Sequence, residues 1–130
     1  MTGSSGRPFR YVAMVTAITL TLSACGTIGD TGAIKKAGEY AIDCQTDKAL
    51  AALEKAQQAG GLAAYLAELE KIVFLQDAGR EQEAAAALQS YHAEHDQDSR
   101  SREETEKSIQ DSLKELRDQR FKKTGQRTCK

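Results

Sequence analysis

Cys25 is the residue whose type and setting point most clearly to chemistry. Its thiol is a good nucleophile, and the small residues directly before it would fit a protease cleft. Residues 11–22 upstream are uncharged and mostly apolar, and the first ten residues carry two arginines and no acid. This apolar run is shorter than the ~20 residues that a membrane-spanning helix needs. The pattern predicts a secretory signal peptide over residues 1–24.

The stretch Leu22-Ser23-Ala24-Cys25 resembles the lipobox of bacterial lipoproteins. In that family the cysteine receives a diacylglycerol, the leader is cut just before it, and the new amino terminus is acylated, commonly with palmitate. The resemblance implies a lipidated Cys25 that anchors the protein in a bacterial membrane. Gly26, where inner-membrane members commonly carry Asp, favours the periplasmic face of the outer membrane in a Gram-negative source. An ordinary signal peptide with an unmodified Cys25 is the alternative.

Two further cysteines, Cys44 and Cys129, remain if Cys25 carries lipid. An exported protein meets an oxidising compartment, where an even number of cysteines favours a disulfide. A bridge between them would tie the first helical hairpin to the C-terminal end and stabilise the fold by ~4 kcal/mol. Two free or intermolecular thiols are the alternative, because sequence gives no distance.

His92, Glu94 and His95 form the one candidate metal group in the sequence. Zinc takes at least three protein ligands, and two histidines near a helix end do not close a site, so no metal site is predicted. The chain contains no glycine-rich phosphate loop, nucleophile elbow, C-x-x-C pair or H-E-x-x-H motif. We therefore expect neither an enzyme nor a cofactor, and an exported protein makes nucleic acid an unexpected partner.

Helix-forming residues dominate the part of the chain after the leader, and no stretch alternates apolar and polar residues as a strand would. The sequence predicts one small all-α domain. The segments 47-DKALAALEKA-56 and 82-QEAAAALQSY-91 are similar and lie 35 residues apart. Each places two small or aromatic residues and one leucine on a single helix face: Ala49, Leu53 and Ala56 in the first, and Ala84, Leu88 and Tyr91 in the second.

This spacing is similar to the second helix of a tetratricopeptide repeat (TPR), and the resemblance covers residues 33–95. It implies antiparallel helical hairpins, with a first helix at 33–42 and another at 62–78 whose broad apolar stripe contacts neighbours on two sides. Gly60 and Gly61 break the chain between the units, and Gly79 ends the second long helix. The tryptophan and the closing proline of the repeat are missing, so a plain antiparallel helical bundle is the alternative.

The segments flanking the repeats are glycine-rich or polar. Residues 25–32 are expected to be a flexible tether, and residues 96–100 a polar break. Ser101 and Glu104 are expected to form a capping box that opens a helix within 101–130, and Glu103–Lys107 to form an ion pair on it. This helix has a thin apolar stripe, formed by Ile109, Leu113 and Leu116. The stripe predicts that the helix covers the last repeat, and a coiled-coil partner surface is the alternative.

These features predict a non-catalytic, lipid-anchored helical module that scaffolds an unknown envelope protein. Stacked hairpins leave a concave face for a peptide or helix. The expected contact residues are the exposed members of one set: Tyr65, Glu68, Lys71 and Ile72. The alternative is a structural lipoprotein that links membrane to cell wall. Two observations support this alternative. The basic tail 117–130 would attract anionic lipid headgroups or envelope polymer. The terminal Lys130 resembles the wall-linked lysine of a small outer-membrane lipoprotein.

Overall fold

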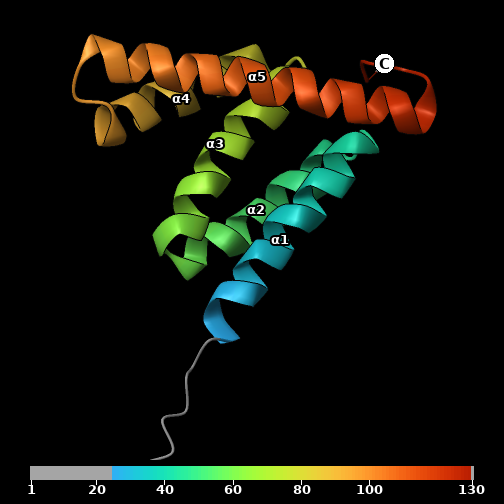
Figure 1. Ribbon diagram of the computed structural model, residues 1–130, viewed down its shortest axis with the longest axis horizontal. Helices are drawn as coiled ribbons and strands as arrows, with labels where there is room; N and C mark the ends of the chain where they lie inside the picture. The colour runs from blue at the N-terminus through green and yellow to red at the C-terminus, as the bar shows by residue number, and fades with distance from the viewer. Residues whose placement is uncertain (1–24, 130) are drawn as a thin grey trace, which may run out of the picture.

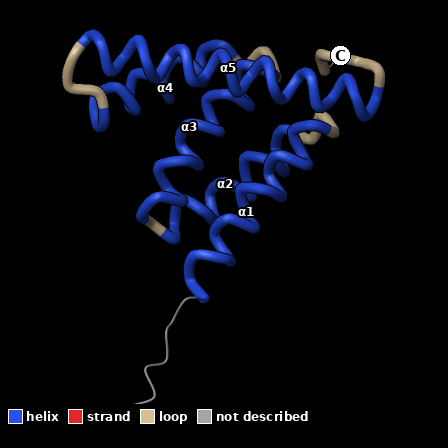
Figure 2. The backbone as a smooth tube through the Cα atoms, viewed as in Figure 1, coloured by secondary structure: helices blue, strands red, loops and turns tan. Residues whose placement is uncertain are grey.

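The computed structural model describes residues 25–129, with side chains from residue 31 onward. The described chain forms five helices and no strand, which confirms the all-α prediction (Figure 2): α1 (Cys25–Ile42), α2 (Thr46–Ala59), α3 (Gly61–Asp77), α4 (Glu81–His95) and α5 (Ser99–Thr124). Among the described residues, no helix is both long enough and apolar enough to cross a membrane. The predicted leader 1–24 and Lys130 lie outside this part of the chain.

The first four helices form two antiparallel hairpins, α1–α2 and α3–α4, and α2 also packs against α3. This succession of contacts is the one expected for TPR-like hairpins. Figure 1 shows α5 lying across one end of both hairpins, from α4 at the left to the α1–α2 turn at the right. It packs against α3 and α1, so a single C-terminal helix covers both hairpins and not only the second one.

The turns inside the two hairpins have the same geometry and lie 35 residues apart. In the first, the Gln45 amide donates to the Tyr40 carbonyl at 2.8 Å; in the second, Arg80 donates to Leu75 at 2.9 Å. A second hydrogen bond lies inside the first one in each turn: the Cys44 amide donates to the Ala41 carbonyl, and the Gly79 amide donates to the Gln76 carbonyl. This pair of bonds is the Schellman pattern that closes a helix C-terminus. The predicted 35-residue displacement is therefore present in the backbone and not only in the sequence.

Small side chains make up much of the core, and they let the helices approach one another closely. Of the six residues predicted to face inward in α2 and α4, five are buried and Leu88 is partly buried. The α5 stripe is buried as predicted. The buried apolar residues are Ala37, Ala41, Ala49, Leu53, Ala56, Ala67, Ile72, Val73, Phe74, Leu75, Ala84, Tyr91, Ile109, Leu113 and Leu116.

The apolar stripe of α3 is covered over only part of its length. Its C-terminal half lies beneath α5 (Figure 1), and Val73, Phe74 and Leu75 are buried there. In the N-terminal half, which α5 does not reach, Leu62 remains 72 % exposed and Leu66 39 % exposed. The stripe therefore changes from core to surface along a single helix.

Two predicted boundaries differ from the observed ones. Helix α1 begins at Cys25, so it includes the segment 25–32 for which the sequence predicted a flexible tether. The capping box of α5 is formed by Asp98 and Ser101, not by Ser101 and Glu104. Asp98 is at least as good an N-cap as serine and lies three residues earlier, so the helix starts at Ser99 and shortens the predicted 96–100 break.

Two side chains of α5 also pair differently from the prediction. Glu104 accepts from Arg100 at 3.0 Å instead of capping the helix. Lys107 pairs with Asp111 at 2.5 Å, one turn further along α5, and not with Glu103.

Candidate functional site

A pocket of 190 Å³ opens between α2, α3 and α4. The small side chains of Ala87 and Ser90 leave this space on α4, because longer residues there would fill the gap between the helices. Acidic groups from two helices and one lysine give the pocket its charge. Its lining residues are Gln57 of α2, Glu68 and Lys71 of α3, and Ala87, Ser90, Tyr91 and Glu94 of α4.

Three rings pack together beside this pocket. The His95 ring lies 4.5 Å from the Tyr91 ring and makes an edge-on contact with Tyr65 at 5.3 Å, measured between ring centroids. The two tyrosine rings are 5.6 Å apart. Tyr91 is buried, and this burial raises the pKa of Tyr91 above its ordinary value. The His95 imidazole is therefore in contact with one ring from α3 and one from its own helix, α4.

His95 faces carboxylates from two helices. Its Nε2 lies 2.8 Å from Glu68 Oε2, which α3 supplies from 27 residues away. The same nitrogen lies 3.9 Å from Glu94 Oε2 on its own helix. The sequence placed Glu94 beside His95 but gave no indication of Glu68, because that contact depends on how α3 and α4 pack.

His92 has a different role from His95. Its Nδ1 lies 2.6 Å from Asp96 Oδ2, and its Nε2 lies 3.3 Å from Glu106 Oε1. The other carboxylate oxygen of Asp96 accepts from the Thr105 hydroxyl at 3.1 Å. Because Asp96 is buried, these contacts fix the link between α4 and α5. His92 is therefore bound into the scaffold and does not join His95.

The predicted partner-binding residues divide into two groups. Glu68 and Lys71 line the pocket, and Tyr65 lies next to it and is 39 % exposed. Ile72 is completely buried, so it cannot contact a partner, and the prediction for this residue is wrong. The sequence did not separate Ile72 from the accessible residues, because α3 has a broad apolar face and its helical period does not tell which part of that face other helices cover.

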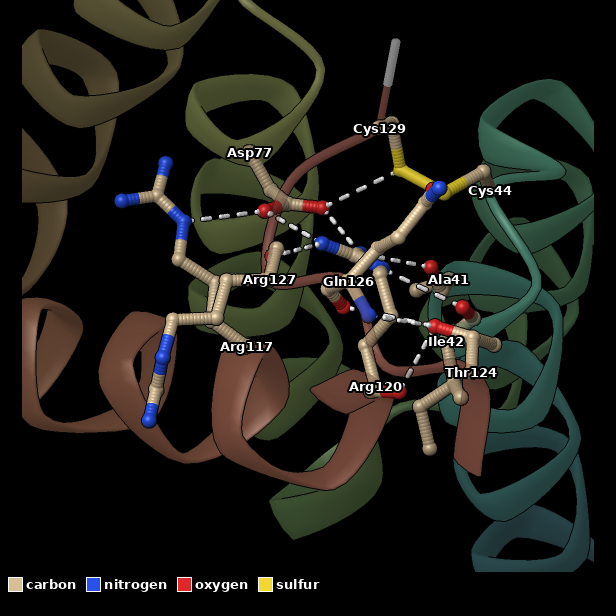
Figure 3. The surroundings of a disulfide bond; sticks show 10 residues. All are labelled: Ala41, Ile42, Cys44, Asp77, Arg117, Arg120, Thr124, Gln126, Arg127 and Cys129. Atoms are coloured by element: carbon tan, nitrogen blue, oxygen red, sulfur yellow. Dashed lines mark hydrogen bonds and ion pairs between the residues drawn. A yellow bond between two sulfur atoms is a disulfide. The ribbon is translucent and has the colours of Figure 1, made fainter. Parts of the chain in front are cut away.

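The predicted disulfide between Cys44 and Cys129 is present, with a Cα–Cα distance of 5.6 Å. It joins the α1–α2 turn to the segment that follows α5 (Figure 3). Cys44 has φ of +58°, a left-handed conformation that a non-glycine residue rarely adopts. The bridge thus starts from the residue that closes the first helix.

Arg120 occupies the centre of the same region (Figure 3). Its buried guanidinium pairs with both carboxylate oxygens of Asp77 at the end of α3. It also donates to the Ala41 carbonyl at 2.8 Å and the Ile42 carbonyl at 3.2 Å, at the end of α1. A further donation at 2.7 Å goes to the Arg127 carbonyl in the tail. One side chain therefore connects α1, α3, α5 and the tail.

Sequence reasoning missed Arg120, although its position was informative. It follows Ile109, Leu113 and Leu116 at helical spacing, so it continues the apolar stripe of α5. An arginine at such a position is expected to be buried with a partner, since burial without one is costly.

Most basic residues of the tail pair with acids of the same chain. Arg117 pairs with Asp77, Lys123 with Asp43 and Arg127 with Asp118. Of these cations, Lys123 lies in the last turn of α5, where the helix dipole also favours a positive charge. They leave less unpaired positive charge for an anionic polymer than the sequence suggested. Lys130, the residue of the wall-linkage hypothesis, lies outside the described residues.

Cys25 is the first residue of α1, and its side chain is not among those described. Its lipidation therefore stays a prediction from the leader sequence. Comparison with known proteins gives no independent assignment, because no family model, curated protein or solved structure matches the chain.

Proposed function

We propose that this protein is a non-catalytic, lipid-anchored module of the bacterial cell envelope, which docks a helix or extended segment of another envelope protein. The observation that carries the docking proposal is the uncovered N-terminal half of α3. Leu62, Tyr65 and Leu66 are exposed there. Large apolar side chains grouped on one helix face are typical of a protein-contact surface.

The surface combines features that interfaces commonly use. Leu62 and Leu66 are one helical turn apart and supply apolar area, while Tyr65 offers a ring and a hydroxyl. Glu68 continues this face into the pocket, where Glu94 adds a second carboxylate. A partner segment with an apolar residue followed by a basic one would complement this arrangement.

Membrane anchoring rests on the leader and on Cys25. Each buried CH₂ group contributes about 0.8 kcal/mol, so two or three acyl chains on one residue would hold the protein stably in the bilayer. Because α1 begins at Cys25, the anchor would attach to the start of a helix. The first hairpin would then lie close to the membrane surface.

Docking can be tested by cross-linking and pull-down from envelope extract with a soluble form. The double variant Leu62→Glu/Leu66→Glu should lose the partner that the unsubstituted chain captures, because it places charge in the apolar contact. Phe121→Glu is the matched control, since Phe121 is 47 % exposed but lies near the end of α5. Equal capture by the double variant, or loss only in Phe121→Glu, would contradict this docking surface.

Anchoring can be tested separately by fractionation. Cys25→Ser should move the protein from the membrane fraction to the soluble envelope fraction and remove the acyl mass from the intact protein. Retention in the membrane after this change would contradict the anchor without affecting the docking proposal.

A further inference from the structure

We propose that Glu68, Glu94 and His95 bind one divalent first-row transition-metal ion, with Zn²⁺ as the probe. One potential ligand atom from each of these residues lies within 4.8 Å of the others. Two neighbouring residues of α4 and one residue of α3 thus converge on a point beside the pocket. The site rests on its own geometry, and a bound ion would occupy the two carboxylates, Glu68 and Glu94, that the docking proposal offers to a basic residue.

The distances suit an ion with small adjustments of the side chains. A tetrahedral Zn²⁺ with ligand bonds of about 2.0–2.2 Å holds its ligand atoms about 3.3–3.6 Å apart. His95 Nε2 lies 2.8 Å from the Glu68 oxygen and 3.9 Å from the Glu94 oxygen. These separations fall on either side of the required range, and both glutamates can adjust by rotating about their flexible stems.

The donor set also favours a transition metal over calcium or magnesium. One imidazole nitrogen and two carboxylate oxygens match the ligands of zinc and its first-row neighbours, whereas calcium and magnesium prefer oxygen alone. Two carboxylates outnumber Lys71, the one lysine that lines this pocket, so the local charge attracts a cation. Three protein ligands leave one position for water.

The surrounding rings prepare His95 for this role. Tyr91 and Tyr65 hold the imidazole against α3, with Nε2 directed toward Glu68. A ligand whose orientation is fixed before binding loses less conformational freedom when the ion arrives. The exposed side of the group, where the Glu94 side chain is 62 % accessible, gives the ion an entry path.

Isothermal titration of Zn²⁺ tests the site on the oxidised full chain carrying Cys25→Ser, so that no free thiol competes. At about pH 7.5 we expect saturable binding of one ion per chain. Glu68→Gln and His95→Asn should each weaken binding at least ~10-fold. His92→Asn and Glu81→Gln are the controls and should leave affinity unchanged, because neither residue belongs to the group.

Thermal unfolding provides a second readout. Zn²⁺ should raise the melting temperature of the starting chain, because the ion would link α3 to α4 in the folded state only. Glu68→Gln should abolish this rise, since the remaining ligands are neighbours on one helix. Absence of saturable binding would overturn the proposal. If Glu68→Gln and His95→Asn both bind Zn²⁺ as tightly as the chain that carries only Cys25→Ser, the proposal is overturned as well, because the ion then binds elsewhere.

Discussion

Cys44 occupies the same position in the first hairpin that Gly79 occupies in the second, 35 residues later. Both residues have positive φ, +58° for Cys44 and +71° for Gly79, and both close a long helix in a Schellman turn. Glycine adopts this conformation without strain, whereas cysteine does not. The first turn thus has a reactive side chain at the strained position, and that side chain forms the disulfide.

Replacing Gly79 by alanine should lower the free energy of unfolding by about 1 kcal/mol, because a Cβ is disfavoured at this backbone conformation. No neighbouring atom blocks the added carbon, so the effect would come from the backbone alone. The matched control is Gly38→Ala, inside α1, which should stabilise the protein by about 0.5–1 kcal/mol. Urea unfolding of both variants measures this, and a shift of the same sign in both would contradict the argument.

Removing the disulfide should destabilise the protein considerably. The bridge spans 85 residues, and closing such a loop is worth about 4–5 kcal/mol in the chain-entropy account. The measured loss for Cys129→Ser should be smaller, because an unfolded chain keeps some residual structure and does not gain the full entropy of an open loop. Reductant should shift the urea midpoint of the starting chain and leave that of Cys129→Ser unchanged. Sensitivity of the variant to reductant would be inconsistent with this pairing.

Arg120→Leu should cost about 3 kcal/mol or more, because it leaves the Asp77 carboxylate buried without its main partner. The Asp77 side chain is only 5 % exposed. Arg117→Leu is the matched control: Arg117 comes from the same helix and pairs with the same carboxylate, but its side chain is 36 % exposed. It should cost no more than about 1 kcal/mol. Equal losses in chemical denaturation would show that burial does not set the strength of these pairs.

Glu70 should make stability depend on pH in the direction opposite to most carboxylates. It lies in a cleft between α1, α3 and α5, where burial raises its pKa above the ordinary 4.5. The folded state therefore holds this proton more tightly than the unfolded state. The Glu70 contribution to stability falls as pH rises from 4.5 through the raised pKa, because the buried carboxylate then ionises.

Glu70→Gln should consequently stabilise the protein at neutral pH and have little effect below pH 4.5, the ordinary value for this carboxyl. Thermal unfolding across this pH range measures the difference. Glu115→Gln is the control, because Glu115 lines the same cleft but is exposed. If Glu115→Gln stabilises the protein at neutral pH as much as Glu70→Gln does, burial of the carboxylate is not the cause of the stabilisation.

The local features of this fold could be read directly from the sequence. Composition and spacing predict helices, the 35-residue displacement predicts two similar hairpins, and the stripe ending at Leu116 predicts a covering helix. These features depend on residues close together in the chain, whose mutual geometry is fixed by the helical period. The disulfide prediction needed one more assumption, an oxidising compartment, and left free thiols as an open alternative.

Packing decided what lies near what, and therefore what can act together. Ile72 and Leu62 belong to one apolar stripe, yet only the tertiary arrangement buries the first and exposes the second. Glu68 meets His95, and Arg120 meets Asp77, across 27 and 43 residues of chain. Such contacts depend on the angles at which helices cross, and those angles result from the summed fit of many side chains.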